Sequence, residues 1–106
     1  MGTIGIKIPV TAALANCVRA MRPFMTFSIA ALKEKIQNHE YVYECEYIDT
    51  DGVGIAIRMV KALAQAGIKA ECYEHDRPCS VAFFRNWHQT GIEIEREMEE
   101  EDEDRL

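Results

Sequence analysis

The sequence predicts an α+β fold, a two-layer sandwich in which helices pack on one face of a three- to four-stranded sheet. Three segments alternate apolar and polar residues, as strands do when one face is buried and the other is solvated. Segments with the helical spacing of apolar residues lie between them. The 106 residues are enough for one hydrophobic core. We therefore expect a compact domain over residues 25–96, an N-terminal arm over 1–24 and a disordered acidic tail over 97–106.

The N-terminal third predicts a short strand followed by two helices. Isoleucines at alternate positions of residues 4–8 indicate the strand, and the proline after it indicates either a sheet edge or the strand's end. Thr11 is the expected N-cap of the first helix and Ser28 that of the second. Because the second start is well marked and follows Met25 closely, we expect residues 1–24 to be a dispensable arm.

The rest of the chain predicts alternating strands and helices. Residues 41–49 alternate tyrosine or cysteine with acidic or aliphatic residues, which is typical of a strand with one solvated face. A helix follows from Asp51 to Ala66, and Gly67 is its expected stop. The remaining expected elements are a strand over 68–73, a turn over 75–78, a helix over 80–90 that Gly91 ends, and a strand over 92–95.

The net charge of −6 is concentrated at the C-terminus. Residues 95–106 carry eight acids and two arginines, whereas residues 1–94 carry ten acids and ten bases. The first 33 residues contain four basic residues and no acid, so charge is polarised along the chain. Proteins that bind nucleic acid usually present a basic surface. The charge pattern therefore argues against direct nucleic-acid binding.

The composition predicts a reduced, cytoplasmic protein. Apolar residues make up 48% of the chain, but no run approaches the roughly 18 apolar residues that span a bilayer, so we expect no membrane partner. The four cysteines show no C-x-x-C spacing, and the N-terminal segment lacks the features of a signal peptide. We expect free thiols, as in the cytoplasm, and no cofactor.

An acidic sheet face is the first candidate site. If the helices cover one face of the sheet, the alternation places a set of glutamates on the other, offset by Lys69. This set consists of Glu44, Glu46, Glu71, Glu93 and Glu95. Together with the tail it predicts a small non-catalytic interaction or regulatory module that meets a basic protein surface, including one whose natural ligand is nucleic acid.

A reactive thiol at Cys79 is the alternative. Cys79 lies next to an expected helix start, where free N–H groups favour a thiolate, and Arg85 and His75 could add positive charge. The spacing of Cys79 and Arg85 resembles the C-x5-R motif of tyrosine-phosphatase-like enzymes, which implies a thiolate nucleophile and a phosphate-binding arginine. The competing interpretation is that residues 78–80 form only a turn and a helix cap.

Two further motifs have structural alternatives. The sequence YIDTDGVGI resembles the D-x-D-G motif of haloacid-dehalogenase-like phosphatases, which would make Asp49 a nucleophile and Asp51 an acid/base near magnesium. The alternative is that Thr50 or Asp51 caps the following helix. Four zinc-type ligands fall within 17 residues without the paired spacing of closed zinc sites, so we expect no metal site. These four residues are Cys72, His75, Cys79 and His88.

Overall fold

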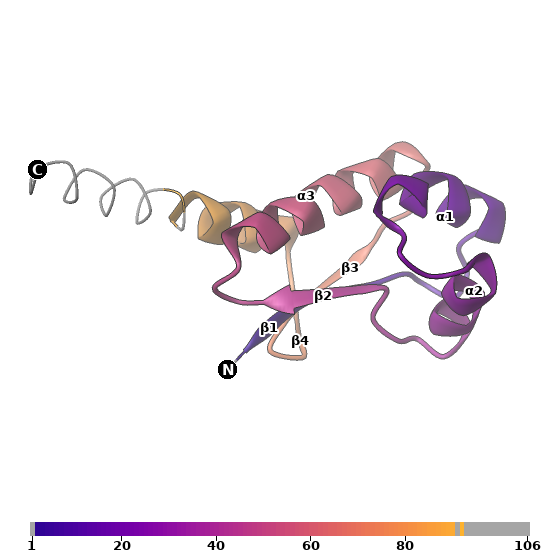
Figure 1. The fold of residues 1–106 in the computed structure, drawn as a ribbon, viewed down its shortest axis with the longest axis horizontal. Coiled ribbons are helices and arrows are strands. Elements are labelled where there is room, and N and C mark those ends of the chain that lie inside the picture. The colour runs from indigo at the N-terminus through magenta and orange to yellow at the C-terminus, as the bar shows by residue number, and fades with distance from the viewer. Residues whose placement is uncertain (1, 91, 93–106) are drawn as a thin grey trace, which may run out of the picture.

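The computed structural model describes residues 2–90 and 92 and confirms the α+β class. Its sheet has four antiparallel strands in the order β2-β1-β3-β4. Figure 1 shows α3, α1 and a last helix over residues 81–90 on one side of the sheet, with α2 beside its end. The elements are β1 (Thr3–Lys7), α1 (Leu14–Met21), a 3-10 turn (Arg22–Phe24), α2 (Ile29–Gln37), β2 (Tyr43–Glu46), α3 (Thr50–Gln65), β3 (Glu71–Glu74) and β4 (Arg77–Cys79).

Strand β1 lies in the interior of the sheet, between β2 and β3. Ile4 is opposite Cys45 on one side and Glu74 on the other, and Ile6 and Ile8 are as fully buried as Ile4. The strand has no edge position, so the edge interpretation of Pro9 was wrong and the proline marks the strand's end. The arm over residues 1–24 thus contributes the central strand of the sheet.

The two N-terminal helices begin differently. Ser28 caps α2 as predicted, because its hydroxyl accepts a hydrogen bond from the Ala31 N–H at 3.1 Å. The prediction that Thr11 caps α1 was wrong. The N-cap is Ala13, whose side chain makes no capping bond, because a turn closed by a bond from the Ala12 N–H to the Pro9 carbonyl precedes the helix.

Helix α3 has more buried residues than α1 or α2. Its N-cap is Asp49, which accepts a hydrogen bond from the Gly52 N–H at 3.0 Å, so neither Thr50 nor Asp51 has the predicted role. Gly67 follows the helix with φ of +80°, which confirms it as the stop. The buried residues of α3 are Gly52, Val53, Ala56, Met59 and Leu63.

The fourth strand of the described residues is β4, which the sequence did not predict. His75 and Asp76 both have positive φ, 50° and 64°, and form the two-residue turn of a β3–β4 hairpin. The predicted turn over 75–78 is thus shorter, because Arg77 and Pro78 belong to the strand. Ile92 is helical, and residues 93–95, like Gly91 and the tail over 97–106, lie outside the described residues.

Candidate functional site

The sheet face opposite the helices, here called the open face, carries side chains of all four strands. The register places Gly5 between Glu44 and Tyr73, and Lys7 beside Glu71, on this face. The isoleucines of β1 point the other way into the core, because successive side chains of a strand alternate between faces. The open face is thus neither purely acidic nor purely polar.

Tyr41 lies across the open face. Gly5 leaves room for its ring, because a Cβ atom built on Gly5 would lie 2.4 Å from two of the Tyr41 ring carbons. The Tyr41 hydroxyl donates a hydrogen bond of 2.6 Å to the Asp76 carboxylate in the β3–β4 turn. One side chain therefore connects the entrance to β2, the central strand and the hairpin.

Lys7 lies against two aromatic rings on this face. Its ammonium group is 4.8 Å from the Tyr41 ring centroid and 4.7 Å from that of Tyr73. The two rings meet nearly at right angles, at 85°, with centroids 5.6 Å apart. Distances of this size permit cation–π attraction to both rings. The open face thus already holds one basic side chain, its own.

Glu71 is bound by two neighbours. Its Oε1 accepts hydrogen bonds from the Tyr73 hydroxyl at 2.7 Å and from Nε2 of His39 at 2.8 Å. Burial by itself would raise the pKa of Glu71. The two hydrogen bonds and the positive charges of His39 and Lys7 outweigh it and lower the pKa below its ordinary value. Glu71 is therefore engaged within the protein, and its charge is partly offset by Lys7.

The two tyrosine hydroxyls remain protonated donors at neutral pH. The pKa of Tyr41 is raised by burial and by its hydrogen bond to Asp76. The pKa of Tyr73 is raised first by its hydrogen bond to Glu71 and then by burial. Hydrogen bonding to a carboxylate stabilises the neutral phenol because the phenolate could not donate.

Three of the five glutamates of the predicted acidic face lie among the described residues. Glu44 and Glu46 are exposed on the open face of β2, which is an edge strand. Glu71 shares the face but is hydrogen-bonded, and Glu93 and Glu95 lie outside the described residues. Lys7 was not predicted to lie on this face, because the strand of residues 4–8 was expected to belong to a dispensable arm. The alternation of Lys7 with the isoleucines was the available signal.

The structure does not support a phosphate-binding loop at Cys79. This residue belongs to β4, opposite Cys72, and the residues that follow Ser80 towards Arg85 are helical. Burial, then the neighbouring Cys72 and Glu74, raises the pKa of Cys79 to about 11. Ser80 takes the capping position, since it accepts a bond from the Phe83 N–H at 3.4 Å. A thiol in this environment is a poor nucleophile at neutral pH.

His75 has a packing role in the β3–β4 turn. Its ring stacks on Tyr47 with centroids 4.8 Å apart, and its Nε2 lies 3.5 Å from a Glu74 carboxylate oxygen. Tyr47 also contacts the rings of Phe83 and Trp87, and the Trp87 indole N–H donates a hydrogen bond to the Tyr47 carbonyl. This aromatic cluster joins the last helix to the end of β2.

The other motifs of the sequence have structural explanations. Asp49, the nucleophile that the phosphatase resemblance implies, has its carboxylate on the first turn of α3 as the helix cap. Among the described residues, no group of three or more histidine, cysteine, aspartate or glutamate side chains could hold a metal ion. In the same part of the chain, no helix is long and apolar enough to cross a membrane.

Comparison with known proteins adds no relative. No protein-family model, curated protein or solved structure matches the chain.

Proposed function

We propose that the protein is a small non-catalytic interaction module that binds a basic protein surface through Glu44 and Glu46, assisted by its acidic C-terminal tail. The observation that carries this proposal is the exposure of both glutamates on the same face of an edge strand. Two positions apart in a strand, they lie roughly 7 Å from one another, so they can contact neighbouring basic side chains of a partner.

The tyrosines beside the glutamates support the same ligand chemistry. The ammonium group of Lys7 lies within cation–π distance of Tyr41 and Tyr73, and this contact supports the proposal that the face accepts basic side chains. A partner's lysine or arginine would meet the carboxylates of Glu44 and Glu46 at the β2 edge, beside rings that already contact Lys7. Exposed charges of this kind mainly increase the association rate and the selectivity for partners of opposite charge. Their contribution to affinity is smaller.

The tail extends this proposal to a particular class of partner. Residues 95–106 hold eight acids and two arginines. This segment is therefore strongly negative, as nucleic acid is. A basic surface that normally binds nucleic acid is therefore the partner class that we favour. Competition between the protein and a short DNA duplex for such a partner tests this extension separately from the role of the β2 edge.

Charge reversal at the β2 edge tests the proposal. We expect Glu44→Lys and Glu46→Lys together to weaken binding of a lysine- and arginine-rich peptide about tenfold at low salt, since opposite-charge attraction becomes repulsion. Fluorescence anisotropy of the labelled peptide measures the change. Glu34→Lys together with Asp51→Lys, at exposed positions of α2 and α3, changes the net charge by the same amount and is the control. Equal weakening by this control pair, or no weakening by the substitutions at Glu44 and Glu46, would overturn the proposal.

A further inference from the structure

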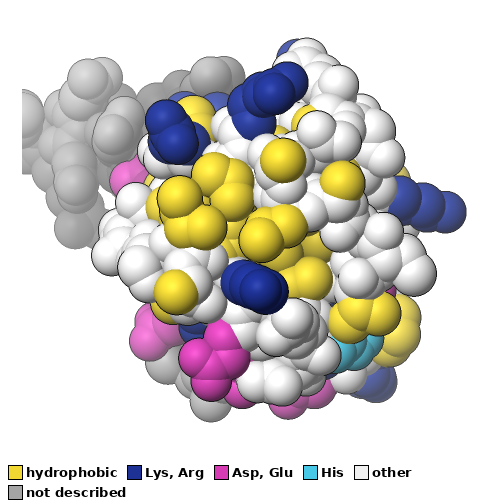
Figure 2. All heavy atoms as spheres, turned by 90° about the vertical axis from the view of Figure 1, so that its right-hand side faces the viewer, with side chains coloured by type: hydrophobic (Ala, Val, Ile, Leu, Met, Phe, Trp, Pro, Cys, Tyr) yellow, Lys and Arg dark blue, Asp and Glu magenta, His cyan; other side chains and the backbone are white. Residues whose placement is uncertain are grey.

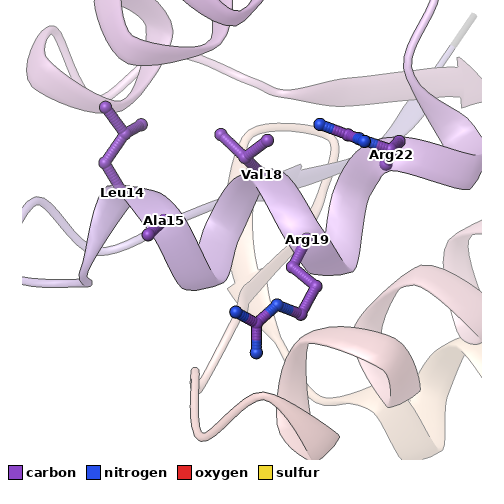
Figure 3. A pocket seen from close by; sticks show the side chains of 5 residues that line it. All are labelled: Leu14, Ala15, Val18, Arg19 and Arg22. Carbon is purple, nitrogen blue, oxygen red and sulfur yellow. The ribbon is translucent and has the colours of Figure 1, made fainter.

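Helix α1 carries a second surface that the open face does not explain. A hollow of about 490 Å³ is lined by Leu14, Ala15, Val18, Arg19 and Arg22. In Figure 3, Leu14 and Val18 project from the same side of α1, the Arg22 guanidinium group reaches back towards Val18, and Arg19 projects from the other side. Apolar side chains and two guanidinium groups thus line the hollow, and only that of Arg22 lies beside Leu14 and Val18.

The charges of this surface are uncompensated. Arg19 and Arg22 are exposed, and within the described residues neither forms an ion pair. Figure 2 views the end of the molecule that carries α1 and α2, and shows apolar side chains at its centre, Lys and Arg side chains above and among them, and Asp and Glu side chains below them. At the start of α2, Ile29 is 49% exposed. An apolar patch with basic side chains beside it can bind an acidic segment that also carries apolar residues.

The chain itself contains such a segment. Residues 93–106 read EIEREMEEEDEDRL, in which Ile94 and Met98 are placed among acids. By contrast, the first 33 residues, which include α1, contain no acid at all. The described chain ends at residue 92, on the side of the molecule opposite α1 (Figure 1). The segment therefore begins far from the hollow of its own copy.

We propose that the hollow on α1 binds the acidic C-terminal segment, residues 93–106, of a second copy of the chain. Arg19 and Arg22 would pair with its glutamates, while Ile94 and Met98 would contact the apolar floor formed by Leu14 and Val18. The contact is head-to-tail, because each copy offers a segment at one end and a hollow at the other. Such heterologous contacts repeat into rings or chains rather than stopping at a symmetric dimer. This inference does not rest on the role of Glu44 and Glu46.

Two complementary variants test the contact in the full-length chain. The hollow variant carries Arg19→Glu and Arg22→Glu and keeps its acidic segment. The segment variant keeps its hollow and carries glutamine in place of Glu97, Glu99, Glu100, Glu101 and Glu103. Analytical ultracentrifugation should show concentration-dependent association of the wild-type chain below about 1 mM, which corresponds to weak binding. Each variant alone should be monomeric, and an equimolar mixture should form a dimer and nothing larger.

The pattern of outcomes separates the possible occupants of the hollow. A monomeric wild-type chain at about 1 mM overturns the proposal, including the case in which small-angle scattering shows that the segment folds back onto its own α1. A mixture of the two variants that does not dimerise also overturns it. Lys61→Glu with Arg77→Glu, both exposed and outside the hollow, is the charge-matched control and should leave wild-type association unchanged. Circular dichroism checks that every variant is folded.

Discussion

At the scale of single residues, the arrangement of the open face depends on Gly5, which has no side chain. Gly5 has no Cβ, and this absence leaves room for the Tyr41 ring beside β1, from where the Tyr41 hydroxyl reaches Asp76. Lys7 then has two rings to contact instead of one. The glycine is required here for close approach rather than for an unusual backbone angle.

Replacing this glycine should displace the tyrosine. We expect Gly5→Ala to lower the free energy of unfolding by about 1–3 kcal/mol, because the added methyl group would overlap the Tyr41 ring. Urea denaturation followed by circular dichroism measures the change. In a chain that already carries Tyr41→Ala, the same Gly5→Ala substitution should change the free energy of unfolding only slightly, since no Tyr41 ring remains for the methyl group to overlap. Equal costs in the two backgrounds would contradict this account of the open face.

At the scale of elements, β1 determines whether the N-terminal arm is needed. The arm supplies three fully buried isoleucines and, in α1, the buried Cys17 and Met21. It also supplies the strand to which both β2 and β3 pair. Without it, β2 and β3 would lose their common partner and their hydrogen bonds.

A chain that begins at Met25 should therefore fail to fold. Truncating a single buried isoleucine costs about 2–5 kcal/mol, and the loss of three exceeds the stability of most domains. Far-ultraviolet circular dichroism and the dispersion of amide signals in an NMR spectrum measure the outcome. A chain that ends after residue 92 is the control and should keep its fold. A folded, cooperatively melting chain from Met25 would instead establish the arm as dispensable.

Some strands and helices could be predicted from local sequence patterns, and others could not. The alternation of Ile4, Ile6 and Ile8 predicted a strand, and Ser28 predicted the start of α2, because both signals act within a few residues. Strand β4 was missed because it has only three residues and contains Pro78. Its pairing with β3 depends on the positive φ angles of His75 and Asp76, which neither residue strongly prefers by itself. The exposed Glu44 and Glu46 were predicted, and the cluster around Lys7 was not.

At the scale of the whole molecule, burial of titratable groups makes the free energy of unfolding depend on pH in the alkaline range. Burial is the first cause that raises the pKa of Cys79 from 9.0 to about 11 and that of Tyr43 from 10.0 to about 12. Between the unfolded and folded values of each group, the unfolded chain releases a proton that the folded chain keeps. The unfolded state then binds fewer protons, so stability falls as pH rises.

We therefore expect the free energy of unfolding to be steady between neutral pH and pH 9 and to fall between pH 9 and about 12. Urea denaturation at a series of pH values measures this decline. Replacing Cys79 with alanine should reduce the fall between pH 9 and about 11, because the alanine side chain does not titrate. An unchanged decline in the Cys79→Ala chain would show that the thiol does not contribute. Tyr43→Phe tests the upper part of the range in the same way.

Local sequence patterns were enough to predict the fold class, most of the strands and helices, and the separation of basic from acidic segments. These properties depend on the spacing of apolar residues and on charge, which are local. Local patterns did not predict that β1 lies in the interior of the sheet, that Lys7 contacts two tyrosines, or that Cys79 is half-buried in a hairpin with a raised pKa. Each of these depends on strand order and register, which bring together residues far apart in the chain.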